Sequence, residues 1–177
     1  MAKYISTKTY GTDRGLSCCF RQWKADHSHC STLHGYSIGI KLIFQSNTLD
    51  EKNWVMDFGG LKAFKAWADH MFDHTMLIAK DDPHLDTFVE LNNIGGGYKD
   101  SGVIDLRIVD AVGCEAFAEM TYHVMNNILT DFQNNDVVFI DDQEFTARYP
   151  VSKDVKLVSV EVFEHAGNSA IYEGDLD

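Results

Sequence analysis

The chain has 177 residues and a formal net charge of −12 at pH 7, a length that supports one hydrophobic core and not two. This acidic balance excludes a general nucleic-acid or anionic-membrane surface, because phosphate groups are bound by clustered Lys and Arg. The sequence has neither an N-terminal secretion signal nor an apolar run of the ~18 residues that a membrane span needs, so we predict a soluble, cytoplasmic protein. Its four cysteines form no Cys-x-x-Cys pair, which favours reduced thiols.

The first 25 residues differ from the rest of the chain in charge. They hold five basic side chains against one acid, Asp13. The basic residues are Lys3, Lys8, Arg14, Arg21 and Lys24. Two interpretations stay open: a binding surface for a small anionic ligand, or the solvated charges of an edge strand.

The first clear strand signal covers residues 37–44, where apolar side chains occupy alternate positions. These side chains are Ile38, Ile40, Leu42 and Phe44. The strand is entered from His34, and the same two-residue period turns His34 and Tyr36 to the face that carries the apolar row. Both rings are therefore expected on the interior side of the sheet.

Two helices follow this strand. Asp57 is a plausible N-cap for a helix that runs to about residue 72, and a second helix is predicted over residues 114–132. Between them, residues 79–112 indicate an irregular insertion with one short strand at 103–109. We predict a single domain over residues 1–177 that contains this insertion.

Three β-rich segments come last, at residues 137–140, 144–149 and 156–164. The order of strands, two helices and strands predicts an α+β fold, in which an antiparallel sheet is backed by helices on one face. In the last strand, one face carries Val158, Val160, Val162 and Glu164. Because Glu164 ends a buried apolar row, its carboxylate needs a partner or a ligand.

The segment around Cys30 carries the first set of side chains that could perform chemistry. His27, His29, Cys30 and His34 lie close together in sequence, and imidazole and thiolate are the usual ligands of zinc. The plain alternative is a polar loop with a buried free cysteine.

Two further sets involve carboxylates. Asp73 beside His74 can orient the imidazole for acid–base chemistry, although charged residues at a helix end are common. His70 and His74 also have a metal-binding spacing, but lack the acid of a His-Glu-x-x-His pattern. Glu164, with Glu115 at the start of the second helix, could accept N–H bonds from a purine or pterin edge; the alternative is a structural ion pair.

The order and spacing of these clusters resemble the 6-pyruvoyl/6-carboxy-tetrahydropterin synthase family over most of the chain. The segments that carry the resemblance are Cys30-x-x-x-His34-Gly35, Val55-Met56-Asp57-Phe58, Asp73-His74, Cys114-Glu115, and Val160 to Glu164 followed by Ala170-Ile171-Tyr172.

The resemblance implies a tunnelling fold. In that fold a four-stranded antiparallel sheet with two helices on one face assembles into a barrel, usually in a homo-hexamer built as a dimer of trimers, with active sites between subunits. It also implies roles for individual residues: Cys30 as the general base, Asp73 and His74 as its proton relay, Glu164 as the pterin anchor and Glu115 as a second pterin contact. The substrate would be 7,8-dihydroneopterin triphosphate.

The spacing of Cys30 and His34 resembles the 6-carboxy-tetrahydropterin synthase branch, which serves queuosine biosynthesis. We therefore expect a carbon–carbon lyase that forms 6-carboxy-5,6,7,8-tetrahydropterin and releases acetaldehyde and triphosphate. The alternatives are 6-pyruvoyl-tetrahydropterin synthase activity and a metal-free pterin- or purine-binding protein of the same fold.

The resemblance further implies a Zn²⁺ site of three histidines, one closing the first strand and two in a His-Gly-His segment. Here the second of that pair is Tyr36, and residues 16–20 match the strand pattern but end in Phe20. Residues 23–27 are a second possible match, which would supply His27. Because one histidine does not hold Zn²⁺, we favour a site rebuilt from His27, His29 and His34, with a metal-free protein as the alternative.

Overall fold

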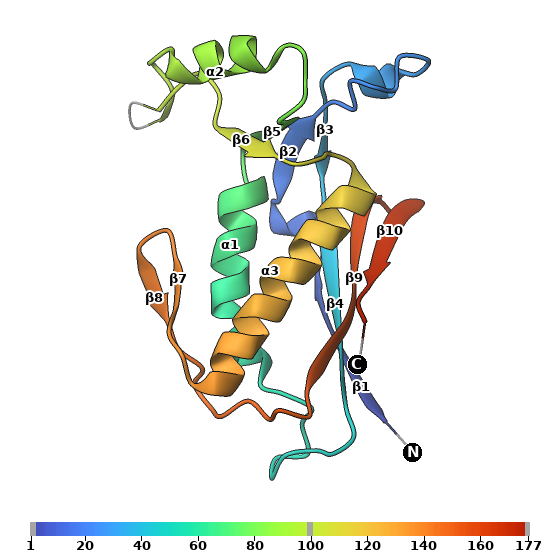
Figure 1. Cartoon of the computed structure of the whole chain (residues 1–177), viewed down its shortest axis with the longest axis vertical. Helices are drawn as coiled ribbons and strands as arrows, with labels where there is room; N and C mark the ends of the chain where they lie inside the picture. Colours follow the sequence, from blue (N-terminus) through green and yellow to red (C-terminus); the bar gives the residue numbers. More distant parts are fainter. Residues whose placement is uncertain (1–2, 99–100, 176–177) are drawn as a thin grey trace.

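The computed structural model of the chain describes residues 3–98 and 101–175. Within those residues the chain forms two four-stranded sheets, a short hairpin and three α-helices (Figure 1). Residues 99 and 100 of the predicted insertion, and the four terminal residues of the predicted domain, lie outside the described part. No helix among the described residues has both the length and the apolar character needed to cross a membrane.

The larger sheet is antiparallel, as predicted, and its strand order is β1-β4-β9-β10. Its strands are β1 (Tyr4–Tyr10), β4 (Gly39–Ser46), β9 (Lys156–His165) and β10 (Asn168–Glu173). The alternating row is fully buried at Ile38, directly before β4, and at Ile40, Leu42 and Phe44 within it, which confirms the two-residue pattern. Helices α1 (Lys62–Phe72) and α3 (Cys114–Asn134) lie on this face of the sheet (Figure 1).

The buried row of β9 differs from the prediction at its first member. The register between β4 and β9 shifts between Ile43 and Phe44, which pair with Ser159 and Leu157. Val158 is therefore the extra residue of a β-bulge and is only half-buried, while Leu157 is buried in its place. Val160 and Val162 are fully buried, so the alternation toward Glu164 is intact beyond the bulge.

Both predicted helices are present. The Asp57 carboxylate accepts a hydrogen bond from the Gly59 N–H at 2.8 Å, and a 3₁₀ turn, η3 (Phe58–Leu61), leads into α1. Helix α3 extends two residues past its predicted end and stops at Asn135, which has the left-handed φ of 61°. Its core face includes Phe117 and Ile128, whereas Met120 and Val124 of the predicted stripe are only half-buried.

The second sheet has the strand order β3-β2-β5-β6 and lies at the upper end of the molecule (Figure 1). Its strands are β3 (His34–Ser37), β2 (Ser17–Phe20), β5 (Thr75–Ala79) and β6 (Leu106–Val109). Strands β2 and β3 are antiparallel, while β5 pairs in parallel with both β2 and β6. This sheet was not predicted, because its strands are short and lack a long alternating pattern.

The predicted insertion at 79–112 is more ordered than expected. It contains helix α2 (Leu85–Asn93), and the short strand expected at 103–109 is β6. The backbone N–H of His84 donates to the Asp82 carboxylate at 2.9 Å and that of Leu85 to the Asp82 carbonyl at 3.0 Å, so the Asp-Asp-Pro turn starts a helix. The remaining strands, β7 (Val138–Ile140) and β8 (Gln143–Phe145), form the hairpin, and β8 ends four residues before the predicted limit.

Two basic residues of the N-terminal arm are held by acids at the start of this insertion. Arg21 binds Asp82 through two hydrogen bonds of 2.8 and 3.2 Å, and the Asp82 side chain is fully buried. Lys24 binds Asp81 at 2.5 Å, but both side chains are about half exposed or more. Lys8 lies in β1 and Lys3 directly precedes it. Strand β1 is an edge strand of the described sheet, which agrees with the interpretation of these residues as solvated edge-strand charges.

Replacing Arg21 by alanine is expected to lower the free energy of unfolding by about 3–5 kcal/mol, because the Asp82 carboxylate would stay buried without its cation. The matched control is Lys24→Ala, which removes an exposed ion pair worth at most ~1 kcal/mol. Urea unfolding followed by far-UV circular dichroism measures both changes. Equal losses in the two variants would show that burial of Asp82 does not set the energy.

Candidate functional site

The candidate site lies where the end of β9, the start of α3 and strand β3 meet (Figure 1). Cys114 is the first residue of α3 and is buried, and its thiol lies close enough to the carboxylate of Glu164 on β9 for the two groups to interact. Burial, followed by the charges of Glu164 and Glu115, raises the pKa of Cys114 to about 12. Cys114 therefore stays a neutral thiol at pH 7, which can donate a hydrogen bond to the Glu164 carboxylate.

Tyr36 on β3 connects this pair to Cys30. Its phenol is close enough to three acidic groups for their charges to act on it. The pKa of Tyr36 is raised, chiefly by burial and then by electrostatic interaction with Glu164, Cys30 and Cys114. Three parts of the chain that are far apart in sequence, residues 30–36, Cys114 and Glu164, thus contribute to one polar cluster.

The position of Cys30 is fixed by the segment between β2 and β3. Cys30 is half-buried in a 3₁₀ turn, η2 (His29–Ser31), whose N-cap Ser28 accepts a hydrogen bond from the Cys30 N–H at 3.2 Å. The Cys30 carbonyl accepts a hydrogen bond from the Gln22 N–H at 2.8 Å. The turn is therefore tied back to the end of β2, which holds the cysteine beside the cluster.

Glu115 lies exposed in the first turn of α3, where a negative charge is favourable. Gly113, just before the helix, has a φ of 115°, and a Cβ atom there would lie 2.6 Å from Nε2 of Gln22 and 3.7 Å from Oε2 of Glu115. Only glycine fits both this conformation and this close approach. Gln22 and Glu115 therefore border the same edge of the site.

The Asp73–His74 pair forms, with the Asp73 Oδ1 and His74 Nδ1 atoms 2.6 Å apart. His74 has a φ of 59°, and its side chain is 87 % exposed. A non-glycine residue in the left-handed region is strained, and such residues concentrate at functional sites. The pair is thus presented to the outside of the chain on a strained turn.

The chain does not bring this pair to Cys30. The His74 N–H donates to the carbonyl of Ser17 at 2.8 Å, whereas Phe20, three residues further along β2, pairs with His34. At about 3.3 Å per residue, the two ends of β2 are about 10 Å apart. Asp73 and His74 therefore lie at the opposite end of this sheet from the Cys30 segment.

The three histidines expected to bind zinc are placed separately. His34 on β3 is half-buried, and its Nδ1 lies 2.7 Å from the Thr32 carbonyl oxygen. The His27 side chain is 83 % exposed, and His29 is exposed at the start of η2. Across residues 3–98 and 101–175, no three His, Cys, Asp or Glu side chains are grouped so that they could hold a metal ion.

The register of β2 and β3 favours one of the two segments that resemble the family's first strand. Phe20 pairs with His34 and Cys18 with Tyr36, so residues 16–20 form the neighbour of the His-Gly-Tyr segment, while residues 23–27 lie in turns beyond the strand. The positions of the three expected histidines are then Phe20, His34 and Tyr36. One imidazole, one phenol and one benzene ring are not a donor set for Zn²⁺, which takes three or four nitrogen, sulfur or carboxylate ligands at about 2.0–2.3 Å.

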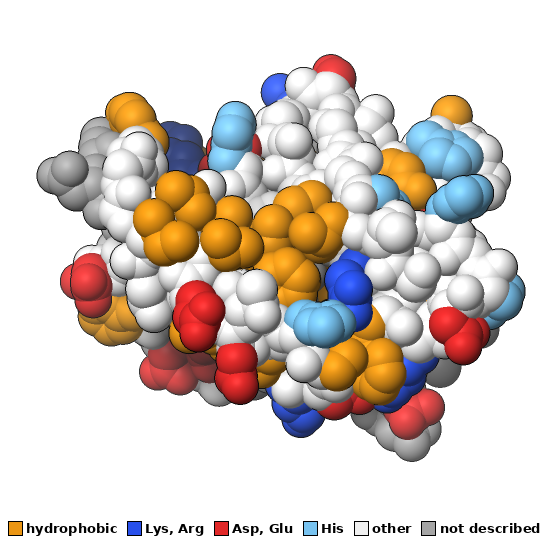
Figure 2. All heavy atoms as spheres, turned by 90° about the horizontal axis from the view of Figure 1, so that it is seen from above, with side chains coloured by type: hydrophobic (Ala, Val, Ile, Leu, Met, Phe, Trp, Pro, Cys, Tyr) orange, Lys and Arg blue, Asp and Glu red, His pale blue; other side chains and the backbone are white. Residues whose placement is uncertain are grey.

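A hollow of about 390 Å³ adjoins this end of the molecule. Figure 2 looks down on that end and shows hydrophobic side chains gathered in its middle, histidines beside them, and most acidic side chains toward the rim. The hollow is lined by Gln22, Trp23, Lys24, Ala25, His27, Ala79, Asp81, Asp110, Ala111 and Val112. Gln22 connects it to the edge formed with Glu115.

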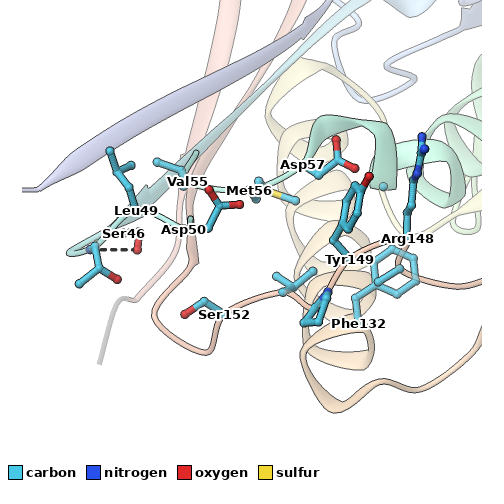
Figure 3. Close-up of a pocket in the computed structure, with 15 residues that line it drawn as sticks. Ser46, Leu49, Asp50, Val55, Met56, Asp57, Phe132, Arg148, Tyr149 and Ser152 are labelled. Atoms are coloured by element: carbon cyan, nitrogen blue, oxygen red, sulfur yellow. Dashed lines mark hydrogen bonds between the residues drawn. The ribbon is translucent and has the colours of Figure 1, made fainter. Parts of the chain in front are cut away.

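A second pocket of about 160 Å³ lies at the other end of the molecule (Figure 3). It is lined by the end of β4, the segment that leads into α1, and the segment between β8 and β9, which contribute Ser46, Asp57 and Tyr149 among others. Ser46 ends β4, next to the start of β9 at Lys156. Lys156 precedes Glu164 by eight residues on the same strand, so the pocket lies about 26 Å from Glu164. This pocket is separate from the candidate site.

Two members of the cluster were not predicted as functional residues. Cys114 precedes Glu115 at the start of a predicted helix, but nothing in the sequence indicates that its thiol reaches the end of β9. For Tyr36 the available signal is its position on the same face as His34. By sequence it is only the residue that stands where the family has a zinc-binding histidine.

The chain matches the sequence profile of the family described as 6-pyruvoyl tetrahydropterin synthase over residues 12–175. It is 30% identical over 81 residues to a 6-carboxy-5,6,7,8-tetrahydropterin synthase from Rickettsia felis, a match that covers 41% of this chain and 59% of that protein. The synthase of the same name from Rickettsia typhi is 32% identical over 62 residues, covering 34% of this chain and 45% of that protein. The chain thus spans about three fifths or less of the length of these curated relatives.

Solved structures share the fold, among them two that match this chain over nearly its whole length. An uncharacterized protein from Wolinella succinogenes has a TM-score of 0.72 at 17% identity, with 99% of this chain and 100% of that chain covered. A catalytic-residue mutant of 6-pyruvoyltetrahydropterin synthase from Plasmodium vivax has a TM-score of 0.63 at 14% identity, with the same coverage. Together with the profile match over most of the sequence, these similarities show that the chain belongs to the 6-pyruvoyl tetrahydropterin synthase family.

Proposed function

We propose that the chain converts 7,8-dihydroneopterin triphosphate and one water molecule to 6-carboxy-5,6,7,8-tetrahydropterin, with release of acetaldehyde and triphosphate. The observation that carries this proposal is the cluster of Glu164, Cys114, Tyr36 and Cys30, which sets a carboxylate beside a free thiol. The names of the curated relatives and the spacing from Cys30 to His34 favour the 6-carboxy product. A fused heterocycle with a guanidine-like edge fits such a carboxylate.

In this proposal Glu164 binds the pterin and Cys30 acts as the base. The carboxylate of Glu164 accepts two N–H bonds from the ring edge, while the Cys114 thiol donates to it and holds its orientation. Because the pKa of Cys114 is about 12, that residue does not supply a thiolate at neutral pH. Cys30 is left to take a proton from the three-carbon side chain of the substrate.

Asp73 and His74 would serve a neighbouring subunit. Their imidazole and carboxylate form a hydrogen-bonded pair, but they lie at the far end of the sheet from Cys30 and face outward. An oligomer that brings this outward pair to the Cys30 cluster of the next chain would complete the site. The homo-hexamer and barrel implied by the family resemblance provide such an arrangement. Glu115 would contact the pterin from the start of α3.

Mixed oligomers test this division of the site. We expect Cys30→Ala and His74→Ala chains to be inactive alone, and co-assembly at equal amounts to restore about a quarter of wild-type turnover, because one site in four then draws both groups from intact chains. Co-expression with two affinity tags gives the mixed oligomer, and oligomers of each single variant are the controls. Absence of recovery would place Cys30 and His74 of one chain in the same site.

Product analysis tests the reaction itself. The proposed activity predicts acetaldehyde and a pterin that keeps one side-chain carbon, measured by mass spectrometry. A product that retains all three carbons would instead assign 6-pyruvoyl-tetrahydropterin synthase activity. A third candidate, a pterin- or purine-binding protein without turnover, is favoured by one observation: the positions of the expected zinc ligands do not hold a metal donor set. Binding without any product would support it.

A further inference from the structure

The paired strands β2 and β3 direct four side chains to one face. Phe20 lies directly opposite His34, and Cys18 lies opposite Tyr36. Directly paired residues of an antiparallel ladder point to the same side, and so do residues two apart on one strand. The register therefore brings together the side chains at the three positions compared with the family's zinc ligands. These are Phe20, His34 and Tyr36.

Their rings fill the space where they converge. The ring centroids are 5.0 Å apart for Phe20 and His34, 5.9 Å for Phe20 and Tyr36, and 5.4 Å for His34 and Tyr36. Phe20 is fully buried and packs edge-on against Phe117 of α3, with centroids 5.1 Å apart. The aromatic cluster of Phe20, His34 and Tyr36 is thus an extension of the hydrophobic core, at contact distances typical of aromatic packing.

The histidines of the neighbouring loop do not replace the missing ligands. His27 and His29 belong to the turns after β2 and point into solvent, with the His27 Nδ1 atom 3.9 Å from Asp26. The Nδ1 atom of His34 is engaged with the Thr32 carbonyl, which leaves one ring nitrogen. In the part of the chain that the structure describes, a three-ligand group is not formed.

The outer ring of the cluster, Tyr36, lies near Glu164, the residue proposed to hold the ligand. Tyr36 is half-buried, and Glu164, Cys30 and Cys114 all lie close enough to its phenol to contribute to its raised pKa. His165, the residue after Glu164, is also near, with its ring centroid 6.5 Å from that of Tyr36. A planar ring whose edge is held by Glu164 would therefore lie beside the face or edge of Tyr36.

We propose that this chain binds no metal at the β2–β3 face, and that the aromatic cluster of Phe20, His34 and Tyr36 takes the place of the metal site as a wall against which a planar heterocycle packs. The identity of that heterocycle rests on the proposed function, whereas the absence of metal from this face does not. The cluster is a stable packed unit, so it needs no ion to hold the two strands in register.

Elemental analysis of protein purified without chelator is the first test. We expect less than about 0.1 zinc per chain, since a single imidazole does not retain the ion. About one zinc per chain that is lost on His34→Ala replacement would overturn the proposal. This measurement does not depend on turnover, so it remains decisive if the proposed reaction is wrong.

Rebuilding the ligands gives the converse test. The double variant Phe20→His with Tyr36→His places three imidazoles on the converging positions, and we expect it to gain about one zinc per chain. Circular dichroism establishes that the variant folds, because Phe20 is a core residue. A folded double variant that gains no zinc would show that these three positions do not converge as described.

Ligand binding tests the aromatic wall. With 7,8-dihydroneopterin as the probe in isothermal titration, Tyr36→Ala is expected to weaken binding about tenfold, while Tyr36→Phe, which keeps the ring, retains most of the affinity. The affinity of the wild-type protein should be the same with and without EDTA. Loss of affinity in EDTA, or equal losses in the two variants, would contradict the proposal. Absence of any pterin binding would refute the proposed function and leave the metal result to stand alone.

Discussion

Replacing Cys30 by alanine is expected to lower kcat about 10²–10⁴-fold, the range set by removal of a positioned general base. Cys30 is the half-buried thiol at the edge of the cluster, whereas Cys114 is kept protonated by burial and by the Glu164 charge. Because alanine removes the base and keeps the backbone of η2, pterin affinity should change little. Steady-state kinetics together with titration of a pterin separates the two effects.

Cys19→Ala is the matched control for this variant. Cys19 lies on β2, where Gly35 is its partner on β3, and it points away from the face shared by Phe20 and His34. It is a half-buried thiol like Cys30 and should leave kcat near the wild-type value. If Cys30→Ala turns over normally, or if both variants lose activity equally, Cys30 is not the base.

Replacing Glu164 by glutamine is expected to weaken pterin binding about 100-fold, or ~3 kcal/mol, because charge-assisted hydrogen bonds become neutral and one acceptor becomes a donor. The side chain keeps its size, so the contact with Cys114 loses charge but not packing. The loss should be found in Kd and KM, measured by titration and by initial rates. A fall in kcat with unchanged KM would assign Glu164 to the chemical step instead.

Glu161→Gln controls for the change of charge on the same strand. Glu161 lies three residues earlier on β9, on the opposite face, where it accepts a hydrogen bond from Ser169 at 2.8 Å and lies 3.8 Å from Lys41. It is remote from Cys114 and Tyr36, so pterin affinity should be retained. Equal losses in the two variants would mean that net charge, and not the position of Glu164, determines binding.

The sequence predicts the larger sheet well because its strands carry the two-residue period over long stretches. The clearest case is β4 with the residue before it, where the four alternate side chains at positions 38, 40, 42 and 44 are fully buried. The alternation of buried and exposed side chains is interrupted on β9 at Val158, where a bulge inserts one residue. A bulge within an apolar segment cannot be recognised from the sequence. Helix α2 was missed because the Asp81-Asp82-Pro83 turn suggests a loop, although the same turn provides the hydrogen bonds that start the helix.

The candidate site is predictable only in part, for a physical reason. The sequence identifies Cys30, His34 and Glu164 as chemically capable side chains, but their relation depends on register and on the start of α3. The contact of Cys114 with Glu164 joins residues 50 positions apart, and the strained φ of His74 is a property of the folded turn. The pairing of Phe20 with His34 likewise appears only when β2 and β3 are aligned, and it sets Phe20 directly beside one of the expected ligands.

The most direct test of the central claim is a crystal structure of the protein with a bound pterin such as 7,8-dihydroneopterin. The account predicts that the ring edge donates two hydrogen bonds of about 2.7–3.0 Å to the Glu164 carboxylate, with Tyr36 against the ring and Cys30 facing the side chain. A pterin seated elsewhere, for example in the pocket lined by Asp57 and Tyr149 at the opposite end, would contradict it.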